Sequence, residues 1–385
     1  MKKTLLAVAL TGAFAVTAHA QSSVTLYGSL DAGVAYTSNV GGNSQYALGS
    51  GLVSNNYWGL KGSEDLGNGL HAIFTLENGF NLNNGSFQES NSEFNRQAYV
   101  GLKSDQYGTV TLGRQYDSMV DYLAPLSFTG AGYGNNLAGH PFDNDNLDNT
   151  FSIKNSIKFA SANYNGFSFG GLYGFSNQAN GFATNRAWSA GASYANGPIN
   201  AAASYLQITK GGSTANTGGA TALGNGDANI AANLQRTFGG GVNYTFGPAT
   251  VGLVYTNTHL DGITGLNTSS YAAGGIQTGE NAHFQNAEIN GRYALTPALS
   301  LGASYTFTMA HITGGGADAD ARFHQISLLS DYSLSKRTDV YLEGVYQHAN
   351  GSLGNGRSNV AAINGMSPSD SQNQTVVTVG MRHRF

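Results

Sequence analysis

Histidine and cysteine, the side chains that most often carry catalytic or metal chemistry, form no recognisable site in this sequence. The chain of 385 residues has no cysteine, which excludes thiolate chemistry and a disulfide framework. The zinc spacing His-Glu-x-x-His does not occur. After the first twenty residues, histidines stand singly, at positions 71, 140, 259, 283, 311, 324, 348 and 383. The sequence therefore predicts no enzyme, no metal centre and no cofactor.

One acidic stretch is spaced somewhat like a calcium loop. Asp143, Asp145 and Asp148 alternate with Asn144 and Asn146, but the stretch lacks the glycine and the distal glutamate of an EF-hand. A solvated acidic segment is the favoured interpretation, and calcium binding remains the alternative.

The ends and the composition predict an exported protein. Lys2 and Lys3 precede an apolar run of about a dozen residues and a small-residue cleavage site at 18–20, which is typical of a signal peptide. A buried helix of a cytoplasmic protein is the alternative. The whole chain has 18 lysines and arginines and 22 aspartates and glutamates. Without residues 1–20, which include Lys2 and Lys3, 16 basic residues remain, and the net charge is near −6. That balance gives no basic footprint for nucleic acid.

Low charge without a membrane-spanning helix favours a β-barrel in a membrane. Charged residues make up 10% of the chain, against about 25% in typical soluble domains. No stretch after the signal has 18 consecutive apolar residues. In a barrel only alternate residues meet lipid, and segments at 299–309, 340–347 and 375–385 alternate in this way. Val377, Val379 and Met381 are expected on the outer face, and Arg382 and Arg384 on the inner face or at the periplasmic rim.

The connections alternate in length, which predicts the topology. Short, turn-rich ones lie near 64–69, 104–108, 165–166, 196–198, 247–248, 296–297 and 335–337. Longer polar ones lie near 37–50, 81–93, 117–150, 176–185, 209–232, 260–281, 311–320 and 349–373. Seven short and eight long connections join about sixteen antiparallel strands, the plan of an outer-membrane barrel. Residues 21–385 are expected to form one pore domain.

Aromatic residues gather at the predicted strand ends, where two interfacial girdles would lie. Tyr27, Trp58, Tyr244, Phe307 and Tyr332 are examples. Aromatics in the core of a soluble β-sandwich are the alternative.

Five segments resemble a known family. They are 23–28 (SVTLYG), 58–67 (WGLKGSEDLG), 96–102 (RQAYVGL), 108–116 (GTVTLGRQY) and 379–385 (VGMRHRF). In this order they resemble the general trimeric porins of proteobacteria, in the branch found in Neisseria and Burkholderia relatives. The resemblance implies a homotrimer of sixteen-stranded barrels in the outer-membrane lipid, through which ions and small hydrophilic solutes diffuse passively. It also implies that the third long loop, 117–150, folds into the pore, and that the barrel-assembly machinery reads the terminal aromatic Phe385.

The resemblance also implies a constriction in which basic wall residues face acidic residues of the inserted loop. Arg96 and Arg114 correspond best to the basic positions, with Lys61 and Lys154 beside them; Ser152 takes the place of Lys154 in another alignment. The acidic side would be drawn from Glu77, Asp117 and Asp121. An ion pair that merely holds the loop is the alternative for each of these residues, and for Arg114 the nearby Asp117 is a candidate partner.

One departure from the family pattern bears on ion preference. Tyr57 stands where relatives often have arginine, and together with the negative net charge this weakly favours cations over anions.

Three other functions remain open for a barrel: a substrate-specific channel, an adhesin that works through its long loops, and a membrane-embedded hydrolase. The first would need a ladder of aromatic or charged residues, and the last a Ser/His/Asp group near a strand end; neither is evident.

Overall fold

The computed structural model describes residues 23–89, 92–130, 136–223, 230–266 and 276–385. The predicted signal peptide, 1–20, lies outside these residues. Within the described ranges, no helix has the length and apolar character needed to cross a membrane.

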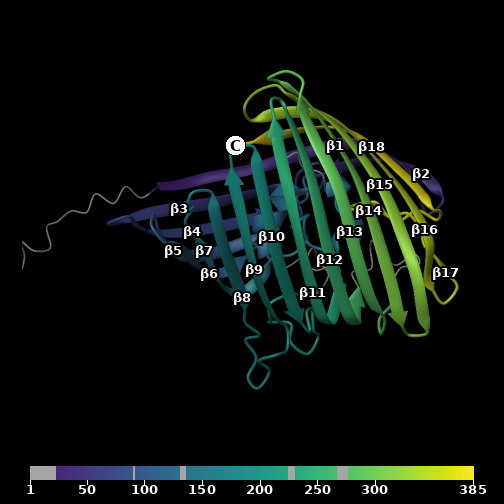
Figure 1. The fold of residues 1–385 in the computed structure, drawn as a ribbon, viewed down its shortest axis with the longest axis horizontal. Helices are drawn as coiled ribbons and strands as arrows, with labels where there is room; N and C mark the ends of the chain where they lie inside the picture. Colours follow the sequence, from purple (N-terminus) through teal and green to yellow (C-terminus); the bar gives the residue numbers. More distant parts are fainter. Residues whose placement is uncertain (1–22, 90–91, 131–135, 224–229, 267–275) are drawn as a thin grey trace, which may run out of the picture.

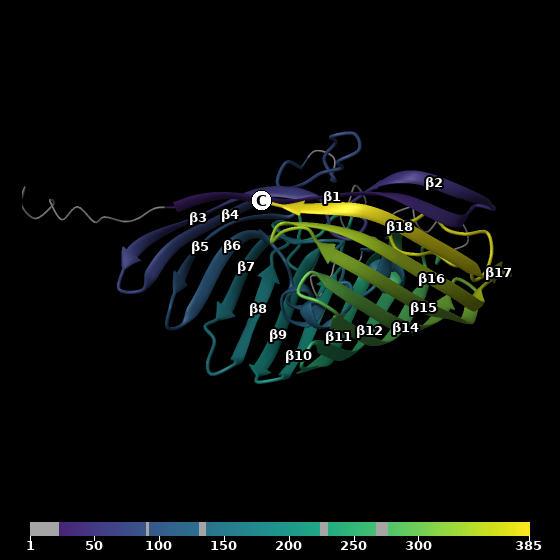
Figure 2. The same ribbon diagram turned by 90° about the horizontal axis from the view of Figure 1, so that it is seen from above.

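Sixteen antiparallel strands form a closed barrel (Figures 1 and 2). Consecutive barrel strands are hydrogen-bonded neighbours, and β18 pairs with β1 to close the ring. The strands are β1 (Ser23–Val40), β3 (Tyr57–Gly67), β4 (Leu70–Gly79), β5 (Gln97–Ser104), β6 (Gly108–Gln115), β7 (Ile153–Ser161), β8 (Phe167–Gly174), β9 (Arg186–Asn196), β10 (Ile199–Thr209), β11 (Ile230–Phe246), β12 (Ala249–Leu266), β13 (Asn281–Ala294), β14 (Leu299–Gly314), β15 (Ala317–Ser333), β16 (Thr338–Gly354) and β18 (Asn373–Arg384). Two further strands, β2 (Asn43–Ser50) and β17 (Arg357–Ser358), pair antiparallel with β1 and β16 but are not among the sixteen strands of the barrel. The predicted barrel of about sixteen strands is confirmed.

Exposure alternates along the strands as the sequence pattern predicts. On β18, Val379 and Met381 are 60% and 52% exposed, whereas Thr378 and Arg382, which flank this pair on the opposite face, are nearly inaccessible. Arg382 pairs with Asp339 and Asp331 on the inner face, and Arg384 also pairs with Asp339. An apolar outer face with a polar inner face is what a strand between lipid and a water-filled lumen requires.

Several predicted loops are shorter in the structure because the strands continue into them. β14 ends at Gly314 and β15 begins at Ala317, so the long loop expected at 311–320 is a tight turn. The segment 37–50 forms most of a hairpin between β1 and β2. Strands β11, β12, β15 and β16 have 17 or 18 residues, more than the roughly 9–11 that span a bilayer. Beyond the lipid the outward residues become polar, and the apolar alternation that marks a strand in the sequence disappears there.

The described parts of the third long connection, 116–130 and 136–152, lie inside the ring of strands, as the blue segment after β6 shows in Figure 2. Its short helices are η1 (Met119–Leu123), η2 (Ala124–Leu126), η3 (Asn136–Ala138) and η4 (Pro141–Asp143). Met119 and Leu123 are fully buried in a cluster with Leu206 and Val254 of the wall. Phe142 packs edge-on against Phe284 and Phe323, with ring centroids 5.9 and 5.5 Å apart. Apolar contact with the inner wall thus holds this pore loop in the lumen.

Candidate functional site

Glu77 on β4 is the centre of a polar group on the inner wall. Its carboxylate accepts hydrogen bonds from the hydroxyls of Tyr27 and Tyr116 and from the Gln97 amide, at 3.0, 3.1 and 2.9 Å. The Arg96 Nε atom lies 3.8 Å from it. Tyr27, Glu77 and Gln97 point to the same side because Gly59 and Glu77 pair across β3–β4, and Tyr27 pairs with Gly59 across β1–β3. The structure therefore joins Glu77 and Arg96, two predicted constriction residues.

Tyrosine rings hold two of the wall cations in fixed positions. The Arg96 guanidinium lies 4.8 Å from the Tyr57 ring centroid and 5.8 Å from that of Tyr116. The Lys61 ammonium lies 4.8 Å from the Tyr27 ring, and Lys61 is exposed. Cation–π contacts of this kind orient a charge without neutralising it. Tyr57, which stands where relatives often have arginine, thus supports a cation instead of supplying one.

Arg114 and Lys154 share a carboxylate that the sequence analysis did not identify. Glu89, in the loop between β4 and β5, lies 2.8 Å from the Arg114 Nη2 atom and 3.5 Å from the Lys154 Nζ atom. Arg114 ends β6 and Lys154 lies near the start of β7, so the two cations are neighbours across this strand pair. The alternative partner expected for Arg114, Asp117, is not bonded to it. Glu89 reaches Arg114 and Lys154 only because of the path of its loop, and no pattern in the sequence around Glu89 predicts this contact.

Asp117 is a structural residue of the pore loop. It is fully buried, and its carboxylate accepts hydrogen bonds from the Met119 N–H and the Asn146 amide, both at 2.7 Å. Burial raises the pKa of Asp117 to about 6, despite these hydrogen bonds. Its carboxylate is engaged within the loop, so Asp117 supports the loop fold next to Asp121 and is not itself exposed to the passage.

Asp121 forms the direct charged link between the pore loop and the basic wall. Its carboxylate lies 2.6 Å from the Lys158 ammonium on β7, which also donates to the Tyr116 carbonyl at 3.0 Å. Asp121 was predicted on the acidic side, whereas Lys158 was missed. The alternation on β7 places Lys158 on the same face as Ser156, and Ser156 is inward and buried.

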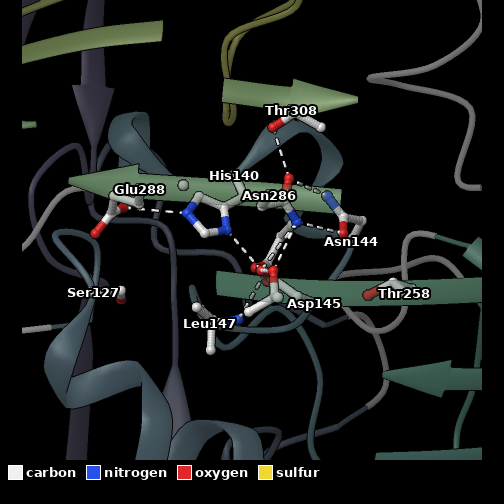
Figure 3. Close-up of polar contacts among 12 residues, drawn as sticks. Ser127, His140, Asn144, Asp145, Leu147, Thr258, Asn286, Glu288 and Thr308 are labelled. Carbon is white, nitrogen blue, oxygen red and sulfur yellow. Dashed lines mark hydrogen bonds and ion pairs between the residues drawn. The ribbon is translucent and has the colours of Figure 1, made fainter. Parts of the chain in front are cut away.

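A buried ionic group anchors the far side of the pore loop to the wall (Figure 3). His140 lies between the loop carboxylate Asp145, 2.6 Å from Nδ1, and Glu288 on β13, 3.2 Å from Nε2. Asn286 donates to Asp145 and to Asn144, and so ties β13 to the same loop segment. Burial by itself would lower the pKa of His140, but the charge of Asp145 and the hydrogen bonds to Asp145 and Glu288 raise it well above its usual value. The imidazole is therefore a buried cation that bridges loop and wall.

The acidic stretch 143–148 is mostly buried, so the expectation of a solvated segment is wrong, and its carboxylates bond to the loop, to the wall and to Asn364. Asp143 accepts hydrogen bonds from the backbone N–H groups of Asp148 and Thr150 and from the Thr150 hydroxyl. Asp148 accepts from the hydroxyl of Thr129 and from the amide of Asn364. In the parts of the chain that the structure describes, no three histidine or acidic side chains are placed to hold a metal ion.

Comparisons with known proteins agree with this architecture. Residues 5–352 match the family described as Gram-negative porin. An outer membrane porin protein of Bordetella pertussis is 32% identical over the whole of both chains. Over the same full coverage, the major outer membrane protein P.IB of Neisseria lactamica is 26% identical. The structure of an anion-selective porin from Comamonas acidovorans has the same fold, with a TM-score of 0.70 at 24% identity over 94% of this chain and 100% of that one. The chain belongs to the Gram-negative porin family and is an outer-membrane passive diffusion channel rather than an enzyme.

Proposed function

We propose that this porin filters solutes by charge between the inner wall of β3–β7 and the pore loop 116–152. The basic side comprises Lys61, Arg96, Arg114, Lys154 and Lys158, and the acidic side comprises Glu77, Glu89 and Asp121. The observation that carries the proposal is the 2.6 Å contact between Asp121 of the loop and Lys158 of the wall. This contact brings the acidic side of the loop directly to the basic wall. Low-dielectric walls focus the field of a few such charges across the passage.

We further propose that the passage favours anions. Lys61 is exposed, and the Lys154 side chain is 24% exposed against 9% for its partner Glu89. The net negative charge of the chain pointed to cations, but much of that charge is in Asp117, Asp143, Asp145 and Asp148, which are buried in the loop fold or against the wall. Burial raises the pKa of Asp117 and Asp143 to about 6 and that of Asp148 well above its usual value, so these groups carry less negative charge at a given pH than exposed carboxylates do.

The test is conductance in planar bilayers with a salt gradient. A general diffusion porin should give large ohmic currents, and anion preference should give a reversal potential of the corresponding sign. Block by a particular solute would indicate a substrate-specific channel. No current from correctly folded protein would leave adhesion as the better proposal. A reversal potential of the opposite sign would overturn the charge assignment and leave the diffusion function intact.

Export and assembly complete the proposal. A signal peptide of residues 1–20 would be removed, so that the mature chain begins at Gln21. Phe385 at the end of the last strand would be read by the barrel-assembly machinery, and three barrels would associate in the outer-membrane lipid. Amino-terminal sequencing of the mature protein and unheated gel electrophoresis of purified outer membranes test these steps.

A further inference from the structure

Histidines that stand singly in the sequence form a row on the outer face of the barrel. His259, His283 and His311 lie on three adjacent strands, β12, β13 and β14, and are directly opposite one another in the strand register. His324 and His348 are opposite one another on the next two strands, β15 and β16. The rings of His259 and His283 are stacked with centroids 3.8 Å apart. Five neighbouring strands, β12 to β16, thus carry one imidazole each; these strands lie side by side in Figure 1.

The imidazole row, defined as these five histidines, points away from the lumen. On β12 the flanking residues Thr258 and Leu260 are buried inside the barrel, so His259 between them faces outward. His311 is exposed between the buried Ala310 and Ile312 in the same way. Position on the outer face excludes a direct part in filtering solutes within the pore.

The row lies on the loop side of the aromatic band. Tyr255 on β12 is outward and exposed, and His259 follows it by four residues, roughly 13 Å along the strand at about 3.3 Å per residue. Phe307 packs against His324 with the two rings tilted and their centroids 5.0 Å apart. The long-loop side of a porin-type barrel is extracellular, and its aromatic band marks the boundary of the hydrocarbon. The imidazoles are therefore at the level of the lipid headgroups in the outer leaflet.

An apolar hollow of about 960 Å³ lies on the same outer face, on the short-turn side of the row. Its outward lining includes Val251, Ile289, Leu301, Leu328 and Leu342. Small residues, among them Gly291, Ala303 and Gly344, make room between these side chains. Val251 lies eight residues from His259 and Leu301 ten residues from His311, roughly 26 and 33 Å along the strands at about 3.3 Å per residue, so the hollow is nearer to the short turns than to the row. Between hollow and row the outer face carries exposed apolar side chains such as Leu253 and Tyr305, and a polar row above an apolar face has the two-part chemistry of a lipid.

The charges around the row are nearly balanced until the imidazoles gain protons. Arg236 on β11, directly opposite His259, is 2.7 Å from Asp261. On the other side, His311 is 2.9 Å from Asp320 and 3.9 Å from Asp318. Arg322 is exposed on β15 between Asp320 and His324. The remaining partners are neutral: Asn257 for His283, the Tyr305 hydroxyl for His324, and Asn373 for His348. Acid therefore converts a surface with two arginines and three aspartates into one with a clear positive excess.

We propose that the imidazole row is a proton-dependent docking surface for phosphate-bearing lipids of the outer leaflet, whose acyl chains lie along the apolar outer face below the row. A phosphate monoester offers the row up to two negative charges and three acceptor oxygens, more than any single aspartate carboxylate does. Stacked imidazolium ions repel each other, and a bound phosphate removes that repulsion. Binding of lipid phosphate and protonation consequently stabilise each other, as linkage requires.

The test measures the preference of the folded mature protein for a phosphate lipid. The protein is reconstituted in phosphatidylcholine vesicles that contain spin-labelled phosphatidic acid or, in parallel, spin-labelled phosphatidylcholine. Lowering the pH from about 8 to about 5, the range in which histidine titrates, should raise the preference for phosphatidic acid. The expected rise is roughly fivefold for each charge added at the lipid surface. The triple variant His259→Asn, His283→Asn, His311→Asn should lose most of this rise, whereas His71→Asn, near a short turn on β4, should keep it.

A second variant keeps the proposal testable if the triple variant assembles poorly. Asp318→Asn with Asp320→Asn frees His311 from its carboxylates and should raise the preference for phosphatidic acid at both pH values. Inorganic phosphate at the same concentration should not displace the lipid, because it lacks the acyl chains. An unchanged preference between the two pH values, an equal rise in the triple variant, or displacement by inorganic phosphate would each overturn the proposal.

Discussion

Phe385 and Gly28 close the barrel by bonding to each other twice. The Gly28 N–H donates to the Phe385 carbonyl and the Phe385 N–H donates to the Gly28 carbonyl, both at 3.1 Å. The Phe385 ring lies against the outer side of Gly28, where a Cβ atom would be 2.6 Å from the ring Cζ atom and 2.5 Å from the Tyr57 carbonyl oxygen. Glycine is therefore required at position 28 for the ring and the ladder to coexist.

Gly28→Ala should impair barrel closure. The added methyl group overlaps backbone on one side and the terminal ring on the other, and such overpacking typically costs about 1–3 kcal/mol. We expect a lower temperature for the loss of the heat-modifiable band on gels. Gly344→Ala is the matched control, because a Cβ atom there meets nothing within 4 Å. Equal thermal stability of both variants would show that the contact with Phe385 is not tight in solution.

Deleting Phe385 should leave the protein exported but poorly assembled. The deletion removes the double hydrogen bond to Gly28 and the terminal aromatic that the assembly machinery is proposed to read. The measurement is the ratio of heat-modifiable barrel to total protein in the outer membrane, and Phe385→Trp, which keeps a terminal aromatic, is the control. Wild-type amounts of folded barrel after the deletion would remove Phe385 from the assembly signal.

Replacing Arg96 and Arg114 with serine should shift the reversal potential toward cations. Glu77 and Glu89 lose these guanidinium partners, and the passage becomes more negative. The Coulomb energy of a unit charge at about 8 Å in water is ~0.5 kcal/mol, so each charge removed should change the permeability ratio by roughly twofold. Arg322→Ser, on the outer face, is the control and should leave the ratio unchanged. An unaltered reversal potential in the double variant would place both residues outside the constriction.

Glu89→Gln should act in the opposite direction. The carboxylate lies 2.8 Å from Arg114 and 3.5 Å from Lys154, so its neutralisation leaves more of their positive charge to the passage. We expect stronger anion preference in the same salt-gradient measurement, by roughly twofold on the Coulomb argument above. Glu64→Gln, exposed near the first short turn, provides the comparison. A shift toward cations would mean that Glu89 supports the loop rather than sets the field.

The sequence predicted those features that depend on local periodicity. Val379 and Met381 alternate with Thr378 and Arg382, and this period alone determines which residues of β18 meet lipid. Glu89 could not be found in the same way, because its contact with Arg114 depends on the path of a loop. The row of histidines on the outer face could not be predicted from the sequence either. His259 and His283 are far apart along the chain, and only the register between β12 and β13 brings their rings together.

Alkaline pH should weaken the attachment of the pore loop to the wall. The pKa of His140 is raised above its unfolded value of 6.5, so its contribution to stability is fully present below pH 6.5 and is lost as the pH rises through the folded pKa. Burial also raises the pKa of Asp143, to about 6, but this carboxyl group changes stability only as the pH rises from its unfolded pKa of 3.8 to about 6, below the range in which His140 acts. The melting temperature of the heat-modifiable barrel should therefore fall between about pH 6.5 and more alkaline values.

The variant His140→Asn isolates the histidine in this pH dependence. It should melt at a lower temperature near neutral pH, since loss of one partner from a buried ion pair typically costs about 3–5 kcal/mol. Its melting temperature should then change less than that of the wild type as the pH rises, because no imidazolium remains to be lost between Asp145 and Glu288. His71→Asn, whose ring is near the barrel rim, should retain the wild-type slope. Parallel slopes for wild type and His140→Asn would show that His140 is neutral in the folded barrel, in which case Asp145 and Glu288 would hold it only by hydrogen bonds.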